Sequence, residues 1–467
     1  MKKALATILA LVMAIGVTTI SWADENVAQT TKDGTTTPYT SLTDALNAAK
    51  GGGTVELLGD VTLTGTWTAV GTAADPFKGT FDGKGHTITG LNISTNGNDY
   101  MGFIGMLDGG TVKDVKFANV FVTGKNDVGT AVGRIINGGI VSGVQVLGGT
   151  VSGAKRVGGV VGSIKASGTV SDCTNAAVVT ANDRNAGGIV GSAYYTETGK
   201  QMYITNCVNN GAVTASGVRG VCGGIVSLSA ANVSGNTNTA AVKGTEVGGI
   251  VGEQKSYGSV TNNTNSGAVT NTGGNAAYGA GGIIGWLRYH ETSEANAYPV
   301  SEIISVTGNK NSGSVTGGND AGGIVGTVYN SAVIMNNKNT ATSFSAATFA
   351  AGIVGNYQTT ERPAAEAPAQ NKLTFGSDNT SAATLEQINA NCKDLLIYTN
   401  GNPIIEEVVP DPTPEQPPHY YYHPTTDTKA DDTKGSPKTF DAGIALYVGM
   451  ALTSAAGVAF VGKKRED

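Results

Sequence analysis

A five-residue phrase, best written Gly-Gly-Ile-Val-Gly, occurs in nine near-copies between residues 102 and 355 and constrains the fold more than any other feature. Successive copies end 25 to 41 residues apart. A second phrase occurs together with the first and contains an Asn followed by small residues and, in most copies, Val. The Asn residues of its six copies are Asn175, Asn209, Asn238, Asn265, Asn311 and Asn339. Repetition at such a period is typical of a solenoid, in which each unit buries its apolar face against the next.

Each unit consists of short runs of Val, Ile and Thr separated by Gly and Asn, with no helical period. A unit of about 28 residues is long enough for three short strands and three bends per turn. We therefore predict an all-β protein, a parallel β-helix of about nine to twelve coils with short helical caps. A disordered stalk and a C-terminal apolar helix are expected to follow it.

The recurring Asn residues are expected to stack from coil to coil as a ladder of hydrogen-bonded amides. Turn formation by Asn in the left-handed conformation is a compatible alternative. Cys173 and Cys207 hold equivalent places in consecutive copies and should also stack, whereas Cys222 and Cys392 have no such match. We expect free buried thiols rather than a disulfide, and no metal site, because no Cys-x-x-Cys pair is present.

Composition divides the chain into seven parts. These are a signal peptide at 1–23, an N-terminal segment and helical cap at 24–53, the repeats at 54–355, a C-terminal coil and cap at 356–407, a Pro-rich stalk at 408–439, an apolar transmembrane segment at 442–462 and a basic cytoplasmic tail at 463–467. Within the caps we predict a helix over 41–50 that begins at Ser41, a second helix over 384–396 and a last strand over 403–405.

The end of the stalk, residues 436–441, carries Ser436, Pro437, Lys438, Thr439 and Phe440 directly before the apolar segment. This order resembles the wall-sorting signal of Gram-positive surface proteins, in which a sortase joins Thr to peptidoglycan. The resemblance implies a sortase-type transpeptidase and peptidoglycan as partners. Ser436 and Phe440 depart from the family's Leu and Gly, so a plain membrane anchor is the alternative.

The run from Pro76 to Ile93, followed by Tyr100–Gly105 and the Gly-Gly-Ile-Val-Gly series, resembles the GLUG-repeat proteins of bacterial surfaces. That family includes adhesin-like proteins and repeat segments of some IgA-cleaving metalloproteases. The resemblance covers about residues 54 to 405 and implies a surface-displayed, right-handed β-helix.

Charge argues against nucleic acid as a partner, because the chain has a formal net charge of −6 and its exported body shows no basic patch suited to phosphate. The acidic residues of the repeats are expected to be scattered in phase, which argues against catalysis and against a cofactor; they are Asp114, Asp127, Asp172, Asp183, Glu246, Glu253 and Asp320. The string that begins at His290 lacks the second His of a zinc protease motif.

The three longest insertions, 192–203, 286–304 and 356 to about 375, begin directly after the last Gly of a phrase. Insertions at the same position of successive repeats emerge at the same edge of a stacked solenoid, so we expect these loops to gather on one side of the stack. Their exposed aromatic and Arg side chains form the predicted ligand site: Tyr194, Tyr195, Tyr203, Trp286, Arg288, Tyr289, Tyr298 and Tyr357. The sequence thus favours a non-catalytic, adhesin-like protein that contacts a host or cell-surface glycan or protein; a ligand-free spacer and a carbohydrate-active enzyme are the alternatives.

Overall fold

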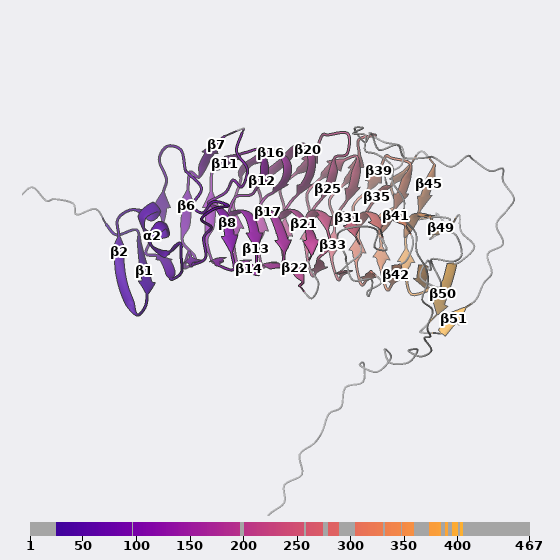
Figure 1. Ribbon diagram of the computed structural model, residues 1–467. Helices are drawn as coiled ribbons and strands as arrows, with labels where there is room; N and C mark the ends of the chain where they lie inside the picture. Colours follow the sequence, from indigo (N-terminus) through magenta and orange to yellow (C-terminus); the bar gives the residue numbers. More distant parts are fainter. Residues whose placement is uncertain are drawn as a thin grey trace, which may run out of the picture. The chain divides into compact units, whose positions relative to one another are not determined.

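The computed structural model describes residues 25–95, 97–196, 200–255, 258–273, 279–288, 304–329, 332–346, 348–358, 373–383, 388–390, 395–399 and 402–404. These residues form a parallel β-solenoid whose coils stack along one axis (Figure 1). Four sheets, which we name A to D, run along the stack, and the chain visits them in the order A, B, D, C in each turn. Each turn therefore contributes to four sheets, not to the three that we predicted from repeat length.

The strands of sheet A, in spatial order, are β2 (Thr35–Tyr39), β1 (Ala28–Lys32), β3 (Thr54–Leu57), β5 (Thr80–Asp82), β9 (Thr111–Lys113), β14 (Gly139–Ser142), β18 (Gly168–Ser171), β22 (Met202–Thr205), β27 (Asn232–Ser234), β32 (Ser259–Thr261), β37 (Ser305–Thr307), β42 (Ala332–Met335), β47 (Leu373–Gly376), β50 (Leu395–Thr399) and β51 (Asn402–Ile404). Those of sheet B are β4 (Val61–Thr62), β6 (Thr87–Thr89), β10 (Lys116–Ala118), β15 (Gln145–Val146), β19 (Thr174–Asn175), β23 (Val208–Asn209), β28 (Thr237–Asn238), β33 (Thr264–Asn265), β38 (Lys310–Asn311), β43 (Lys338–Asn339) and β48 (Thr380–Ser381).

Sheet D contains β7 (Asn92–Ser94), β11 (Val120–Thr123), β12 (Asn126–Val128), β16 (Gly149–Gly158), β20 (Val178–Gly187), β24 (Val213–Ala215), β25 (Val221–Gly223), β29 (Val242–Gly244), β30 (Glu246–Gly248), β34 (Val269–Asn271), β35 (Gly279–Gly281), β39 (Val315–Thr316), β40 (Asp320–Gly322), β44 (Phe344–Ser345) and β45 (Phe349–Ala351). Sheet C contains β8 (Ile104–Asp108), β13 (Val132–Ile136), β17 (Val161–Ala166), β21 (Val190–Thr196), β26 (Val226–Ser229), β31 (Val251–Lys255), β36 (Ile284–Arg288), β41 (Val325–Tyr329), β46 (Val354–Gln358) and β49 (Ile388–Ala390). The 10 strands of sheet C and the 11 of sheet B fall within the predicted range of coils.

The predicted amide ladder is present in the interior. Asn265, at the end of β33, accepts a hydrogen bond from the Nδ2 of Asn238 at 2.8 Å and donates its own Nδ2 to Asn311 at 2.9 Å. The same contact links all six Asn residues of the second phrase. Each amide nitrogen also donates to the carbonyl two residues ahead, so the ladder residues shape the local bend as well. None of the six has a positive φ, so the left-handed turn alternative does not apply to them.

The ladder explains why the two repeated phrases occur together in the sequence. In six of the nine copies the second Gly of the phrase faces a ladder amide, as Gly249 faces Asn265, and a Cβ there would overlap the amide group. Glycine at that position lets the backbone approach the Asn side chain. The apolar residues of both phrases fill the rest of the interior, where the Val and Ile side chains are buried.

A second ladder, which we did not predict, lies two residues before the first. It is formed by Asn236, Asn263, Asn309, Asn337 and Asn379, whose amides are linked at 3.0 Å. Cys207 precedes this ladder and donates its backbone N–H to Asn236. Cys173, Cys207 and Cys222 are buried free thiols, as predicted, whereas Cys392 lies outside the described residues.

The N-terminal end begins with a hairpin and a helix. Strand β1 pairs antiparallel with β2 and β3, and α2 (Leu42–Ala49) lies beside them and buries Leu42, Leu46 and two alanines. The Ser41 hydroxyl accepts from the backbone N–H of Asp44 at 3.3 Å, so the helix begins where the capping residue predicted it.

The predicted second helix over 384–396 is wrong for the part of it that the structure describes. Residues 388–390 form β49 and residues 395–396 belong to β50, since Ile388 continues the row of Val354 and Leu395 the row of Leu373. Stacking on the preceding coil overrides the weak local helical pattern here. The final strand, β51, pairs antiparallel with β50.

The chain divides into two compact units, residues 1–411 and 412–467, and all described residues lie in the first. The predicted signal peptide, stalk, sorting motif and apolar segment lie outside the described residues. Among the residues that are described, no helix has the length and apolar character needed to cross a membrane.

Candidate functional site

The first repeated phrase forms the bend between sheet D and sheet C, and its glycines let the two strands lie against each other. A Cβ at Gly162 would overlap the backbone of Asp127 in the preceding coil. The bend brings two residues of the same coil together. One lies two positions before the first Gly of the phrase, and the other lies directly after its last Gly, seven residues further along the chain. We call the two facing rows that result the D–C seam.

The rows of the D–C seam follow from strand register. The row on the sheet D side contains Tyr100, Asp127, Arg156, Asn185, Val221, Glu246, Gly279, Asp320 and Phe349. The sheet C row contains Met106, Arg134, Ser163, Ser192, Leu228, Glu253, Trp286, Thr327 and Asn356. Our prediction that the acidic residues are scattered in phase is therefore wrong, because Asp127, Glu246 and Asp320 share one row. Each stands two residues before a Gly-Gly or Gly-Thr pair, a signal that was visible in the sequence.

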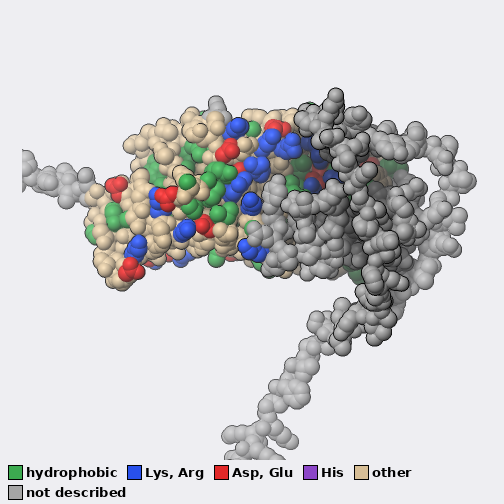
Figure 2. All heavy atoms as spheres, in the orientation of Figure 1, with side chains coloured by type: hydrophobic (Ala, Val, Ile, Leu, Met, Phe, Trp, Pro, Cys, Tyr) green, Lys and Arg blue, Asp and Glu red, His purple; other side chains and the backbone are tan. Residues whose placement is uncertain are grey.

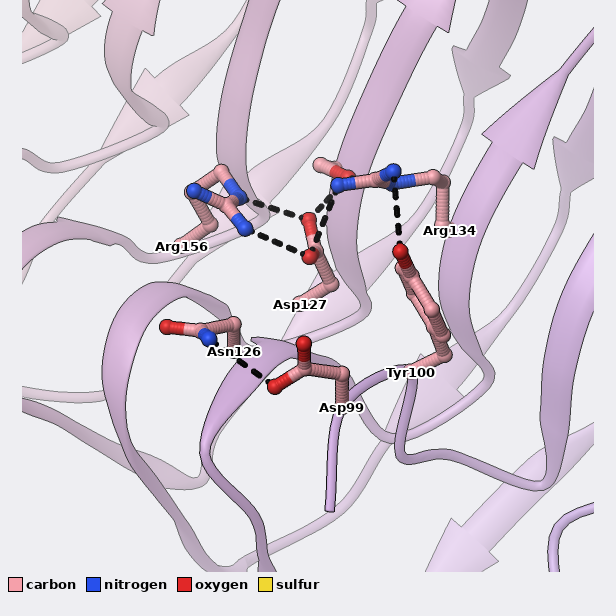
Figure 3. A network of polar contacts seen from close by, with 7 residues as sticks. Asp99, Tyr100, Asn126, Asp127, Arg134 and Arg156 are labelled. Carbon is pink, nitrogen blue, oxygen red and sulfur yellow. Dashed lines mark hydrogen bonds and ion pairs between the residues drawn. The ribbon is translucent and has the colours of Figure 1, made fainter. Parts of the chain in front are cut away.

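The first part of the seam is a cluster of charged groups around Asp127 (Figure 3). The Asp127 carboxylate is fully buried and accepts two hydrogen bonds from the Arg156 guanidinium, at 2.7 Å each, and one from Arg134 at 2.8 Å. The Ser163 hydroxyl donates to the same carboxylate. Arg134 also lies over the Tyr100 ring, 4.6 Å from its centroid. Two arginines are thus held in place by one carboxylate.

The backbone of this part of the row is unusual. Tyr100, Asp127, Arg156 and Asn185 occupy consecutive coils, and each has a φ between 55° and 67°. Asn and Asp tolerate this left-handed conformation, but Tyr and Arg rarely adopt it. A non-glycine residue there costs on the order of 1–3 kcal/mol, and such residues concentrate at functional sites.

The second part of the seam is a pair of buried carboxyl groups, Glu246 and Glu253. The guanidinium of Arg288 lies 3.2 Å and the ammonium of Lys255 lies 3.4 Å from Glu253. No donor among the described residues hydrogen-bonds the carboxylate oxygens of Glu246. Burial, and next the charge of Glu253, raise the pKa of Glu246 well above its ordinary value. The arrangement favours a neutral Glu246.

The third part of the seam surrounds Asp320. Its Oδ2 accepts from the Thr327 hydroxyl at 2.7 Å and from the Asn356 amide at 3.1 Å. Burial raises the pKa of Asp320, and these two hydrogen bonds act in the opposite direction. No cation lies within this cluster among the described groups, so it differs in chemistry from the first two parts.

Basic side chains gather beside the first part of the seam. They are Lys125, directly before β12, Arg134 in β13, Lys155 and Arg156 in β16, and Arg184 in β20. Figure 2 shows Lys and Arg side chains concentrated in the middle of the visible face, where Figure 1 places these strands. We call these five residues the basic segment. The sequence did not reveal it, because the five residues come from three coils.

The residues of the predicted ligand site are only partly brought together. The Lys255 ammonium lies 4.6 Å from the centroid of the Tyr194 ring, and the Arg288 guanidinium carbon lies 4.2 Å from the centroid of the Trp286 ring. These aromatic rings therefore contact the two cations beside Glu253. Trp286 is only 8% exposed, which corrects the prediction that it is an exposed loop residue. Its strand, β36, continues to Arg288 before the insertion begins.

Tyr357 is another correction, because its side chain is fully buried in the apolar core. It lies in β46 in register with Val328 of the coil before, on the inward side of sheet C. Tyr203 is exposed but belongs to β22 of sheet A. Tyr195 lies in β21, and Tyr289 and Tyr298 lie outside the described residues.

The three insertions occur at equivalent positions in their coils, between the same two sheets. Most of the inserted residues lie outside the described part of the chain, so the gathering of these loops on one side stays a prediction. Each follows a strand of sheet C, namely β21, β36 or β46, and precedes a strand of sheet A, namely β22, β37 or β47. The insertions start three to five residues later than predicted, since the strands of sheet C continue beyond the last Gly to Thr196, Arg288 and Gln358. This shift accounts for the burial of Trp286 and Tyr357.

A shallow polar groove lies elsewhere, where sheet A turns into sheet B. It has a volume of about 450 Å³ and is lined by Lys310, Lys338, Asp378 and neighbouring Asn and Thr residues. Among the described residues, no group of three or more His, Cys, Asp or Glu side chains is placed to hold a metal ion.

Comparison with known proteins gives few matches. No family model matches the sequence. A segment of 60 residues, 13% of the chain, is 43% identical to halomucin of Haloquadratum walsbyi, and the match spans 1% of the length of that protein. Among solved structures, a candidate immunoglobulin A1 protease from Bacteroides ovatus is similar over 75% of this chain and 79% of its own, with 17% identity and a TM-score of 0.35.

Proposed function

We propose that this chain is a non-catalytic, adhesin-like binding protein of a Gram-positive bacterium, displayed on the cell surface and anchored to the wall or membrane. The observation that carries the proposal is the D–C seam, which aligns charged side chains of successive coils along one edge of a rigid stack. Polar groups anchored on several coils along one axis suit a long ligand better than a small molecule. The ligand is a host or cell-surface glycan or glycoprotein.

The match to halomucin supports a place outside the cell, since its name describes a mucin. The signal peptide that the sequence predicts is consistent with export. The buried state of Glu246 and Glu253, which are 0% and 2% exposed, favours a structural role for this carboxyl pair over a catalytic one. A hydrolytic carboxylate pair must reach its substrate.

The full chain incubated with an array of glycans and extracellular-matrix proteins tests the proposal. We expect saturable binding to a subset of the array, with no product released from any glycan. Release of oligosaccharides would instead identify a carbohydrate-active enzyme. Absence of binding to every member would favour a ligand-free surface spacer.

Anchoring of the chain to the cell surface requires a separate experiment, since it depends on residues 436–467 and not on the repeats. We propose that a sortase-type enzyme joins Thr439 to peptidoglycan, with the apolar segment 442–462 holding the chain in the membrane beforehand. Muramidase digestion of intact cells should then release the protein, and Thr439→Ala should abolish that release. If detergent alone extracts a chain that retains residues 442–467, the protein is a membrane-anchored protein and the wall linkage is wrong.

A further inference from the structure

We propose that the basic segment binds an acidic polysaccharide, a glycan chain that carries carboxylate or sulfate groups. This inference rests on the proposed function, because it names the ligand class of the surface-binding protein. The segment consists of Lys125, Arg134, Lys155, Arg156 and Arg184, as defined above.

The balance of charge in the segment is opposite to that of the chain. The whole chain has a formal net charge of −6, yet among the described residues these five basic side chains form ion pairs with only two carboxylates, Asp127 and Asp183. A third carboxylate, Asp99, accepts a hydrogen bond from the neighbouring Asn126. Asp127 is fully buried beneath Arg134 and Arg156, so a ligand cannot reach it. The surface that remains accessible is positive and attracts anions against the overall charge of the protein.

The exposed members are available to a ligand. Arg184 is 46% and Lys155 is 37% exposed, and both contact only Asp183 among the described acidic groups, at 3.8 Å and 3.1 Å. Lys125 is exposed and forms no ion pair with any residue that the structure describes. Surface ion pairs of this kind are weak, so an incoming carboxylate or sulfate can replace Asp183 as the partner.

The order of the segment suits a polymer. Lys155 and Arg184 are register partners on neighbouring strands, which places them about 4.8 Å apart along the stack. Successive charges therefore follow the solenoid axis, as the acid groups of an extended glycan chain follow its length. Guanidinium groups bind carboxylate and sulfate oxygens through two parallel hydrogen bonds, which adds specificity to the attraction.

The inner part of the segment is preorganised. Asp127 fixes Arg134 and Arg156 by hydrogen bonds of 2.7 to 2.8 Å, and the Tyr100 ring supports Arg134 from one side. Side chains that are already ordered lose little entropy on binding. The strained backbone at Tyr100 and Arg156 is consistent with a site kept for its geometry.

The same groups favour a glycan over a nucleic acid. Asp183 is 44% exposed among the cations and can accept hydrogen bonds from sugar hydroxyls, whereas it repels closely spaced phosphates. Tyr100 packs against Arg134, so its ring is not offered for base stacking, on which binding of single strands depends.

The test is a titration of the purified full chain with four polymers: chondroitin sulfate, polygalacturonate, neutral dextran and single-stranded DNA. We expect saturable binding to at least one of the two acidic glycans, weakened by added salt, and none to dextran. The double variant Lys155→Glu/Arg184→Glu should bind that glycan at least tenfold more weakly. The milder Lys155→Gln/Arg184→Gln should show a smaller loss in the same direction, with an unchanged melting temperature.

A matched control is Lys310→Glu/Lys338→Glu, which reverses two exposed register partners in sheet B and alters net charge equally. It should bind as the wild type does. The inference is overturned if the control loses affinity as much as Lys155→Glu/Arg184→Glu, if DNA binds more tightly than both glycans, or if neither glycan binds. Binding of a neutral glycan or a protein that both variants retain would leave the proposed function standing and refute this ligand class.

Discussion

The carboxylate of Asp127 accepts two hydrogen bonds of 2.7 Å from the guanidinium of Arg156, a residue 29 positions further along the chain in the next coil. Parallel stacking makes them neighbours, because the row that contains Asp127 is continued by Arg156. The pair illustrates how the solenoid builds a site: each coil contributes one or two side chains, and the bend at the repeated glycines places them together.

Replacing Arg156 by Ala should destabilise the protein by about 2 kcal/mol, because a buried carboxylate loses its bidentate partner while Arg134 remains. Arg156 is 29% exposed, so the loss is smaller than for a fully buried ion pair. Urea unfolding followed by circular dichroism measures it. The double variant Asp127→Asn/Arg156→Ala should be less destabilised than the sum of the single variants, and strict additivity would show that the pair contributes nothing.

Glu246→Gln should stabilise the protein at neutral pH. In the unfolded chain Glu246 ionises above its ordinary pKa of 4.5, whereas burial and Glu253 keep it protonated in the folded state. The wild type therefore loses stability as pH rises from about 4.5 toward the raised folded pKa, by about 1.4 kcal/mol for each tenfold difference in proton affinity between the folded and unfolded states. The amide of Gln replaces the neutral carboxyl and removes this loss.

Thermal unfolding of wild type and Glu246→Gln at several pH values between 4 and 8 checks this prediction. The two proteins should unfold at similar temperatures near pH 4, and the melting temperature of the variant should exceed that of the wild type by an increasing margin as the pH rises to 8. Glu253→Gln serves as the comparison and should destabilise, because Lys255 and Arg288 lose their carboxylate. A Glu246→Gln variant that is less stable at every pH would contradict a neutral Glu246.

Asn265→Ala should be among the most harmful single substitutions in the repeats. It removes the acceptor of Asn238 and the donor to Asn311, and each buried polar group left without a partner costs about 1–3 kcal/mol. The exposed Asn182 provides the control, since its replacement by Ala should change stability by less than about 0.5 kcal/mol. Equal losses of melting temperature for the two variants would show that the ladder has no special importance.

The side-chain contacts of the ladder were predictable from the sequence, whereas the charge pairs of the D–C seam were not, for a physical reason. Asn265 and its equivalents recur as the same residue type in each copy, so in-register stacking alone predicts that their amides meet. Asp127, Arg156 and Asn185 also occupy one row, but their types differ from coil to coil. A row of complementary charges has no repeated letter, and its partners become evident only when register is known.

The errors in the predicted ligand site have a related cause. Trp286 and Tyr357 follow the last Gly of their phrases closely, and we assigned them to loops because the period lengthens there. Both strands of sheet C run three residues past that glycine, to Arg288 and Gln358, so Trp286 enters the seam and Tyr357 the core. An insertion begins where hydrogen bonding to the neighbouring coil ends. The spacing between repeated phrases does not indicate that position.

The central claim, that stacked coils place residues of different repeats side by side, is tested most directly by a disulfide between register partners. Lys155→Cys and Arg184→Cys lie on adjacent coils about 4.8 Å apart, within the range that a disulfide spans. Asn126→Cys and Arg184→Cys lie two coils apart, beyond that range. After mild oxidation, peptide mass spectrometry should find the cross-link in the first double variant and not in the second; a cross-link in the second, or none in the first, would contradict the account.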